Sequence, residues 1–219
     1  MALHPPDALS AHPWRLAEFG ALYVATPLAI AFLLPPGRIF PALFLFSLAG
    51  LLLLWRTGGF DWRSLIRGNR IPWWEVAGIA LATLVSGVAI MWLARPEALF
   101  AMVRARPEFL LVIWCLYPLL SALPQELIFR PLFFHRYGAI LPHGQAAIAV
   151  NAAIFSFAHL MYWSWVVALM TFCGGWIFAR AYLRHGFPAA WLLHAVAGNV
   201  LFAVGMGHYF YSGNVVRPF

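Results

Sequence analysis

The sequence predicts an all-α fold, a polytopic transmembrane bundle of about seven helices. Hydrophobic residues make up 63% of the 219 residues and charged residues only 10%, which is far from the composition of a soluble domain. Most of the apolar stretches also approach the roughly 20 residues that a helix needs to cross a bilayer. We therefore expect a single integral membrane domain over 1–219, without a separate soluble domain.

Breaks between the apolar stretches set the expected helix boundaries. Pro-Pro-Gly at 35–37 separates the first two helices, and Gly-Gly at 58–59 opens a polar loop that runs to about Arg70. This loop mixes Arg with Trp and Leu, which fits a segment lying on lipid headgroups as well as it fits a plain connection. The seven predicted helices are 16–34, 39–55, 73–94, 109–137, 144–161, 163–184 and 187–207.

The net charge of +7 comes from arginine alone, because the chain has no lysine. The arginines are scattered over short loops between apolar stretches, so we expect membrane lipid as their partner and no nucleic acid. The positive-inside rule predicts a cytoplasmic N-terminus. The side of the membrane that holds the N-terminus carries Arg15, Arg56, Arg63, Arg67, Arg70, Arg136, Arg180 and Arg184, and the other side carries Arg38, Arg95, Arg104, Arg106 and Arg217.

Several catalytic chemistries are excluded by the residues that are missing. A Ser–Lys dyad needs a lysine, the H-E-x-x-H motif is absent, and the only aspartates, Asp7 and Asp61, fall in the N-terminal tail and in a loop. Among the acids, only Glu126 lies toward the interior end of an apolar stretch. A charge at the bilayer centre costs about 2.5–3.5 kcal/mol on insertion scales, so Glu126 is a candidate functional residue.

The stretch LPQELIFR, residues 123–130, places Glu126 and Arg130 four residues apart on one helix face. An ion pair that closes a helix end and a hydrated functional site both fit this spacing. Pro124 and Pro131 flank the motif and predict a bent helix. A bend frees backbone carbonyls that must be satisfied by the protein or by water in a cavity, which favours the hydrated site.

Two more polar positions fall at membrane depth. FSFAHL places His159 four residues after Phe155, and WLLHAVAGNV places His194 and Asn199 in the middle of the last helix. A single histidine in a span is often only a hydrogen bond between helices. Two histidines together with the Glu126 motif, each on a different helix, indicate one shared site. We therefore expect Glu126, His159 and His194 to lie around one cavity.

These residues resemble the CAAX protease and bacteriocin-processing family of intramembrane endopeptidases, also called the CPBP or Abi family. The family pattern reads E-E-x-x-x-R, then F-x-x-x-H, then H-x-x-x-N, on successive helices. Glu126 and Arg130 match the end of the first motif, Phe155 and His159 match the second, and His194 begins the third. The resemblance covers a motif-bearing core of about 110–205 and implies a CAAX-protease-like bundle.

The chain departs from the family pattern at two positions. Gln125 stands where the family usually has its first Glu, the residue taken to activate water. Asn199 lies five residues after His194 instead of four, which turns it about 140° away on a regular helix, and Gly198 takes its place. The departures fit a bacterial branch that reads Pro-Gln-Glu and His-x-x-x-x-Asn, and hence a bacterial inner membrane. An engineered Glu-to-Gln change at position 125 remains an alternative.

The resemblance implies hydrolysis of a peptide bond in a peptide or protein substrate, including membrane-anchored ones. Glu126 would activate the water in place of Gln125, Arg130 would hold the carboxylate, and His159 would orient the water. His194 and Asn199 would donate hydrogen bonds to the oxyanion.

Three alternatives stay open on the residues alone. Glu126, His159 and His194 form a two-His, one-carboxylate set that suits a zinc ion, although we favour a mechanism without metal or cofactor. Gln125 also fits a non-hydrolytic scaffold or immunity protein that has lost its base. A small transporter would place the same polar residues along a substrate path, but the sequence has no inverted repeat.

Overall fold

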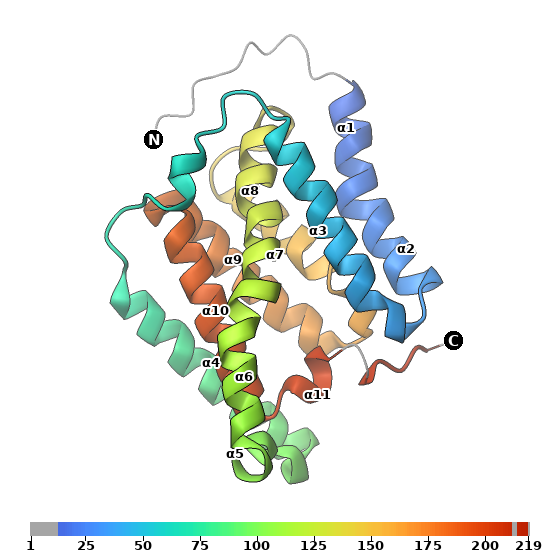
Figure 1. Cartoon of the computed structure of the whole chain (residues 1–219), viewed down its shortest axis with the longest axis vertical. Helices are drawn as coiled ribbons and strands as arrows, with labels where there is room; N and C mark the ends of the chain where they lie inside the picture. The colour runs from blue at the N-terminus through green and yellow to red at the C-terminus, as the bar shows by residue number, and fades with distance from the viewer. Residues whose placement is uncertain (1–12, 212–213, 219) are drawn as a thin grey trace.

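The computed structural model describes residues 13–211 and 214–218, and every regular element within these residues is a helix (Figure 1). Within this part of the chain, six helical stretches are long and apolar enough to cross a membrane, and α3 adds a shorter apolar helix. The predicted fold class, a polytopic bundle of about seven helices, is confirmed, and the protein is an integral membrane protein.

The helices begin and end within about three residues of the positions that the sequence predicts. Two of the stretches are composite, because π-helical turns join their α-helical parts. Shorter helices α5 (Ala101–Ala105) and α11 (Gly207–Phe210) lie outside the main bundle. The long stretches are α1 (Pro13–Gly20) with α2 (Thr26–Leu33), α3 (Ile39–Trp55), α4 (Trp73–Ala94), α6 (Pro107–Tyr117) with α7 (Leu123–Leu127), α8 (Gln145–Phe157), α9 (Trp165–His185) and α10 (Phe187–Val204).

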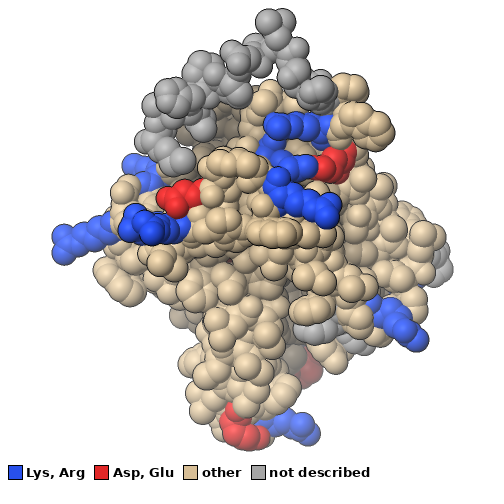
Figure 2. All heavy atoms as spheres, turned by 45° about the horizontal axis from the view of Figure 1, so that its top comes forward, with Lys and Arg blue, Asp and Glu red and all other residues tan. Residues whose placement is uncertain are grey.

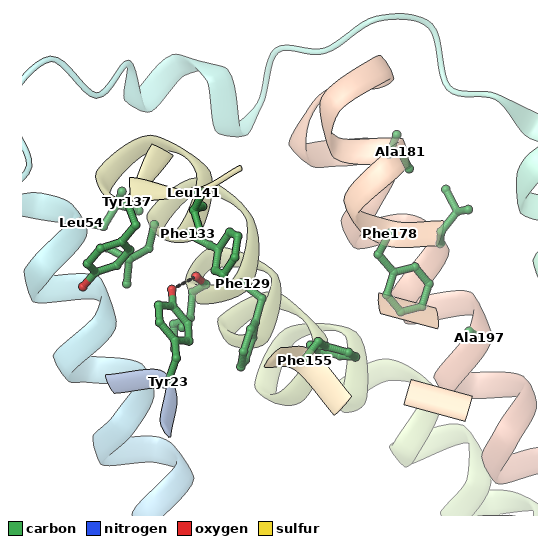
Figure 3. Close-up of a cluster of buried hydrophobic side chains, with 14 of the residues drawn as sticks. Tyr23, Leu54, Phe129, Phe133, Tyr137, Leu141, Phe155, Phe178, Ala181 and Ala197 are labelled. Carbon is green, nitrogen blue, oxygen red and sulfur yellow. Dashed lines mark hydrogen bonds between the residues drawn. The ribbon is translucent and has the colours of Figure 1, made fainter. Parts of the chain in front are cut away.

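The stretch that contains α6 and α7 forms one long, bent ribbon through the middle of the molecule (Figure 1). Its last part, the π-helical segment η6 (Ile128–Arg136), buries Phe129 and Phe133 almost completely. These rings pack in one apolar cluster with side chains from α3, α8, α9 and α10, including Phe155 and Phe178 (Figure 3). Helices on all sides therefore hold the segment that carries the acidic motif.

Prolines explain why this ribbon is bent and widened. A proline has no N–H to donate and clashes with the carbonyl four residues earlier, and a wider π-helical turn relieves that clash. The widened turns leave carbonyls open to other donors. The Tyr23 hydroxyl donates to the Ile128 carbonyl at 2.7 Å (Figure 3), and Asn151 Nδ2 donates to the Phe129 carbonyl at 2.7 Å. Side chains of other helices thus satisfy these carbonyls. The prolines of this stretch after Pro107 are Pro118, Pro124 and Pro131.

Hydrogen bonds and an ion pair join α1 to the end of η6. Arg136 donates to both Glu18 carboxylate oxygens, from Nε at 2.5 Å and from Nη2 at 2.8 Å, and its Nη1 donates to the Thr57 hydroxyl at 2.9 Å. The Tyr137 hydroxyl donates to Glu18 at 2.6 Å. Burial and the neighbouring carboxylate raise the pKa of Tyr137 above its ordinary value, so the hydroxyl remains a donor throughout the neutral pH range.

Arginine side chains gather at the same end of the bundle, while the tan middle of the surface shows few charges (Figure 2). The polar loop after α3 belongs to this end and contains a short 3₁₀ helix, Trp62–Leu65. Asn69 ties the loop to α9, because its N–H and its Nδ2 donate to the carbonyls of His185 and Arg184 at 2.9 and 2.8 Å. The loop is thus fixed to the bundle while its arginines, Arg63, Arg67 and Arg70, are exposed.

We predict that Glu18→Gln destabilises the protein. The change keeps the shape of the side chain but leaves Arg136 without a carboxylate in a half-buried position, which costs about 1–3 kcal/mol. Thermal unfolding in detergent micelles measures the effect. Glu97→Gln is the matched control, because the Arg95–Glu97 pair is 3.8 Å apart and its side chains are 52% and 67% exposed. Equal melting temperatures for the two variants would contradict the prediction.

Candidate active site

A fully buried ion pair forms the centre of the candidate site. Glu126 and Arg130 are both 0% exposed, and Arg130 donates to the carboxylate from Nε at 2.9 Å and from Nη2 at 3.3 Å. The remaining guanidinium nitrogen, Nη1, donates to the side-chain oxygen of Asn151 on α8 and to the Phe129 carbonyl. Each donor nitrogen of the guanidinium therefore has an acceptor at membrane depth, as a buried charge requires.

His194 on α10 completes this cluster from a third helix. Its Nδ1 lies 2.9 Å from Glu126 Oε1. Because a carboxylate only accepts hydrogen bonds, Nδ1 must carry the proton, and Nε2 of the neutral ring carries the lone pair. The ring stacks on Phe178 with centroids 4.8 Å apart and meets the edge of Phe155 at 5.6 Å. Two aromatic rings and one carboxylate thus fix both the position and the tautomer of His194.

A partly open cavity of about 590 Å³ lies beside this cluster. Gln125 and His159 both line it, whereas Glu126 and Arg130 do not. The side-chain oxygen of Gln125 is buried and lacks a hydrogen-bond partner within the described residues, while its Nε2 donates to the Ser121 hydroxyl at 3.0 Å. This oxygen has almost no accessible area, so the amide must turn before a ligand or a water molecule can donate a hydrogen bond to it.

His159 presents its reactive nitrogen at the same wall. Its Nδ1 donates to the Phe155 carbonyl at 2.8 Å, so the neutral ring carries its lone pair on Nε2. Phe155 and His159 are in ring contact, with centroids 4.8 Å apart. In the described part of the chain Nε2 has no hydrogen-bond partner, and it is not sealed from solvent. In the F-x-x-x-H motif, the backbone carbonyl of Phe155 therefore fixes the tautomer of His159.

The structure brings together only part of the predicted site. Glu126, Arg130 and His194 are in direct contact, and His159 lies beside them across the Phe155 ring. The expectation that Glu126, His159 and His194 lie around one cavity is met only for His159, because neither Glu126 nor His194 lines it. Adjacent residues point about 100° apart on a helix, and Gln125 takes the open side in place of Glu126.

Asn199 is turned away from the other predicted residues. Its Nδ2 donates to the Trp114 carbonyl at 3.2 Å, and its own carbonyl accepts from Trp114 Nε1 at 2.9 Å. It therefore ties α10 to α6 and does not line the cavity. The five-residue spacing from His194 explains this outcome, since α10 continues as a regular helix through Gly198.

The zinc alternative requires Glu126, His159 and His194 to converge on one point. Within the described residues, no three His, Cys, Asp or Glu side chains lie close enough together to hold a metal ion. The Nδ1 atoms donate to Glu126 and to the Phe155 carbonyl, which leaves only the two Nε2 atoms as possible histidine ligands. The described geometry therefore does not bring the three side chains together as a zinc site.

The predicted site did not include three residues of the cluster. Asn151 holds Arg130, Phe178 stacks on His194, and Tyr117 lies edge-on to His194 at 6.1 Å. Asn151 does carry a signal in the sequence, since it is a polar residue in an apolar helix two turns before His159. The two aromatic residues carry no signal in so apolar a chain.

Together, the fold and the cluster define a membrane-embedded site in which acid, arginine and histidine side chains from several helices meet beside a cavity. The family described as type II CAAX prenyl endopeptidase Rce1-like matches residues 107–200, from the start of α6 into α10. The match covers all three motifs, and in general terms it supports a CAAX-protease-like intramembrane endopeptidase. No curated protein and no solved structure matches the chain.

We predict that Glu126→Gln strongly destabilises the protein. The change leaves the Arg130 charge buried and unpaired, and breaking a buried pair costs about 3–5 kcal/mol. The double variant Glu126→Gln/Arg130→Gln carries no buried charge and should recover part of the loss. Thermal unfolding in detergent measures both.

The matched control for this prediction is Gln125→Ala. The neighbouring side chain lines the cavity, so its loss should change the melting temperature little. A Glu126→Gln variant as stable as Gln125→Ala would contradict a structural role for the ion pair.

Proposed function

We propose that the protein hydrolyses a peptide bond held in the cavity between Gln125 and His159. The observation that carries this proposal is that both side chains line one cavity and that His159 Nε2, which has no partner in the described residues, is open to it. A water molecule in the cavity beside Gln125 could lose a proton to His159 Nε2.

The proposed reaction begins when His159 Nε2 takes a proton from this water. The water oxygen attacks the carbonyl carbon of the substrate, and the carbonyl oxygen becomes an oxyanion. His159 then gives the proton to the departing amide nitrogen as the C–N bond breaks, which yields a carboxylic acid and an amine. The reaction uses no metal ion and no cofactor.

Glu126 could act in one of two ways, as a direct base or through His194. As a direct base, the role that the sequence predicts, it would first have to release one oxygen from Arg130 or His194, because both of its oxygens accept hydrogen bonds. The contacts support an indirect role, in which Glu126 holds His194 in the tautomer with Nε2 free and Arg130 holds Glu126.

The walls of the cavity support a substrate that comes from within the membrane. Most of the lining side chains are apolar, and two of them, Phe44 on α3 and Leu120 after α6, are 67% and 60% exposed on the outer surface. The cavity therefore reaches the outer face of the bundle between these helices. A peptide next to a membrane anchor would enter there without leaving the lipid.

We also propose the orientation in the membrane. The end of the bundle that holds the start of α1 carries eight arginines at or near the helix ends, against five at the opposite end. The positive-inside rule then puts the N-terminal end in the cytoplasm, and the resemblance to a bacterial branch suggests a bacterial inner membrane.

A second candidate function is a peptide-binding membrane protein without hydrolytic activity. It is favoured by Gln125, because an amide at the position of the family's first acid cannot accept a proton at neutral pH. Such a scaffold or immunity protein would keep the cavity and the buried ion pair but would leave the bound peptide intact.

The test is proteolysis of a peptide library in proteoliposomes, read by mass spectrometry. We predict that the unaltered protein cleaves, that 1,10-phenanthroline does not inhibit it, and that His159→Ala slows cleavage by about 10²–10⁴-fold through loss of the general base. Gln125→Glu should raise the rate, because it adds a carboxylate at the same wall of the cavity.

Each outcome separates the candidates. Undiminished cleavage by His159→Ala would refute the proposed base. Folded Glu126→Gln that fails to cleave while His159→Ala still cleaves would restore Glu126 as the direct base. Cleavage by Gln125→Glu alone, with none by the unaltered protein, would establish the non-hydrolytic function.

A further inference from the structure

The third motif lacks a hydrogen-bond donor at its expected place. The residue four positions after His194 lies one turn further on the same face of α10, and that residue is Gly198. Gly198 has no side chain, and Asn199 next to it is bonded to Trp114 on α6. The oxyanion that peptide hydrolysis creates would thus find no amide donor from α10 beside His194.

Tyr117 fills the space that a side chain at position 198 would take. A Cβ atom built on Gly198 would collide with the Tyr117 ring at Cε1, Cζ and the hydroxyl oxygen. The ring also lies edge-on to His194 at 6.1 Å and to Phe202 at 5.5 Å. The glycine and the tyrosine therefore fit each other, and the phenol oxygen lies against α10 one turn from His194.

The Tyr117 hydroxyl is available as a donor. Within the described residues it makes no hydrogen bond, and it is not sealed from solvent. Tyr117 and Gly198 line the same cavity as Gln125 and His159. A phenol in its neutral form has one O–H to give, and the packing of its ring against His194 and Phe202 holds the hydroxyl oxygen in place.

We propose that Tyr117 is a catalytic residue that donates its O–H to the oxyanion, in place of the asparagine that the third motif lacks. The inference rests on the proposed function, since the oxyanion forms only if water attacks the peptide carbonyl. The proton stays on the tyrosine throughout, and only the hydrogen bond to the substrate oxygen strengthens as its charge develops.

The first test is Tyr117→Phe, which keeps the ring against Gly198 and removes only the hydroxyl. In the proteoliposome assay, kcat should fall by about 10²–10³-fold while KM changes little, because the bond forms mainly in the transition state. Tyr209→Phe is the matched control, since Tyr209 lies outside the cavity wall, and it should cleave at the normal rate. An unchanged kcat for Tyr117→Phe would overturn the inference while leaving the proposed function intact.

Rescue distinguishes a donor from a packing residue. Tyr117→Ala removes both the ring and the hydroxyl and should be almost inactive. Adding Gly198→Asn then places an amide in the vacated space and should recover activity, whereas Gly198→Asn alone should lose it because the Tyr117 ring occupies that space. A double variant no more active than folded Tyr117→Ala would count against the inference.

A binding measurement covers the case in which the protein does not cleave. Phosphinic peptides carry an anionic oxygen where the oxyanion would lie, and amide peptides of the same sequences do not. Even without turnover, Tyr117→Phe should weaken binding of a phosphinic library about tenfold and leave the amide library unchanged. Equal losses for both libraries, or none, would overturn the role of Tyr117, whereas a selective loss in an inactive protein would overturn only the proposed hydrolysis.

Discussion

The buried pair of Glu126 and Arg130 is the interaction on which the rest of the structure depends. Two charges without any exposure at membrane depth are tolerated only if every donor and acceptor around them is used. That requirement brings Asn151 from α8 and His194 from α10 to the same point and fixes how three helices meet. The pair thus has a structural role. The neighbouring residue, Gln125, faces the cavity, where the chemistry can take place.

The site separates a sealed face from an open one within a single helical turn. Glu126 supplies charge and order, whereas Gln125 and His159 meet the cavity. Such a division places the permanent charge where it cannot be solvated and leaves the reacting groups neutral in an apolar cavity. A histidine with its tautomer fixed by a backbone carbonyl presents one defined lone pair to the cavity, and the apolar walls make its protonated form costly.

Most of the fold and part of the site could be predicted from the sequence. Apolar length defined the helices, and the spacing of Glu126 and Arg130 correctly predicted one shared helix face. Which of Gln125 and Glu126 meets the cavity could not be predicted, because that depends on π-helical turns that rotate the motif and on partners from α8 and α10. The contact of Tyr117 with Gly198 could not be predicted either, because it depends on how α6 and α10 pack. One aromatic residue among many in an apolar span does not stand out in the sequence.

The separation of the two faces can be measured directly by cysteine labelling. In a Cys115→Ala/Cys173→Ala background, Gln125→Cys reports on the cavity wall, and Ala122→Cys reports on the buried face one turn before Glu126 without disturbing either charge. The structure predicts that a small, water-soluble thiol reagent modifies position 125 rapidly in folded protein and leaves position 122 unmodified until the protein unfolds. Equal rates at the two positions, or faster modification at position 122, would contradict the central claim that the ion pair is sealed while Gln125 is open.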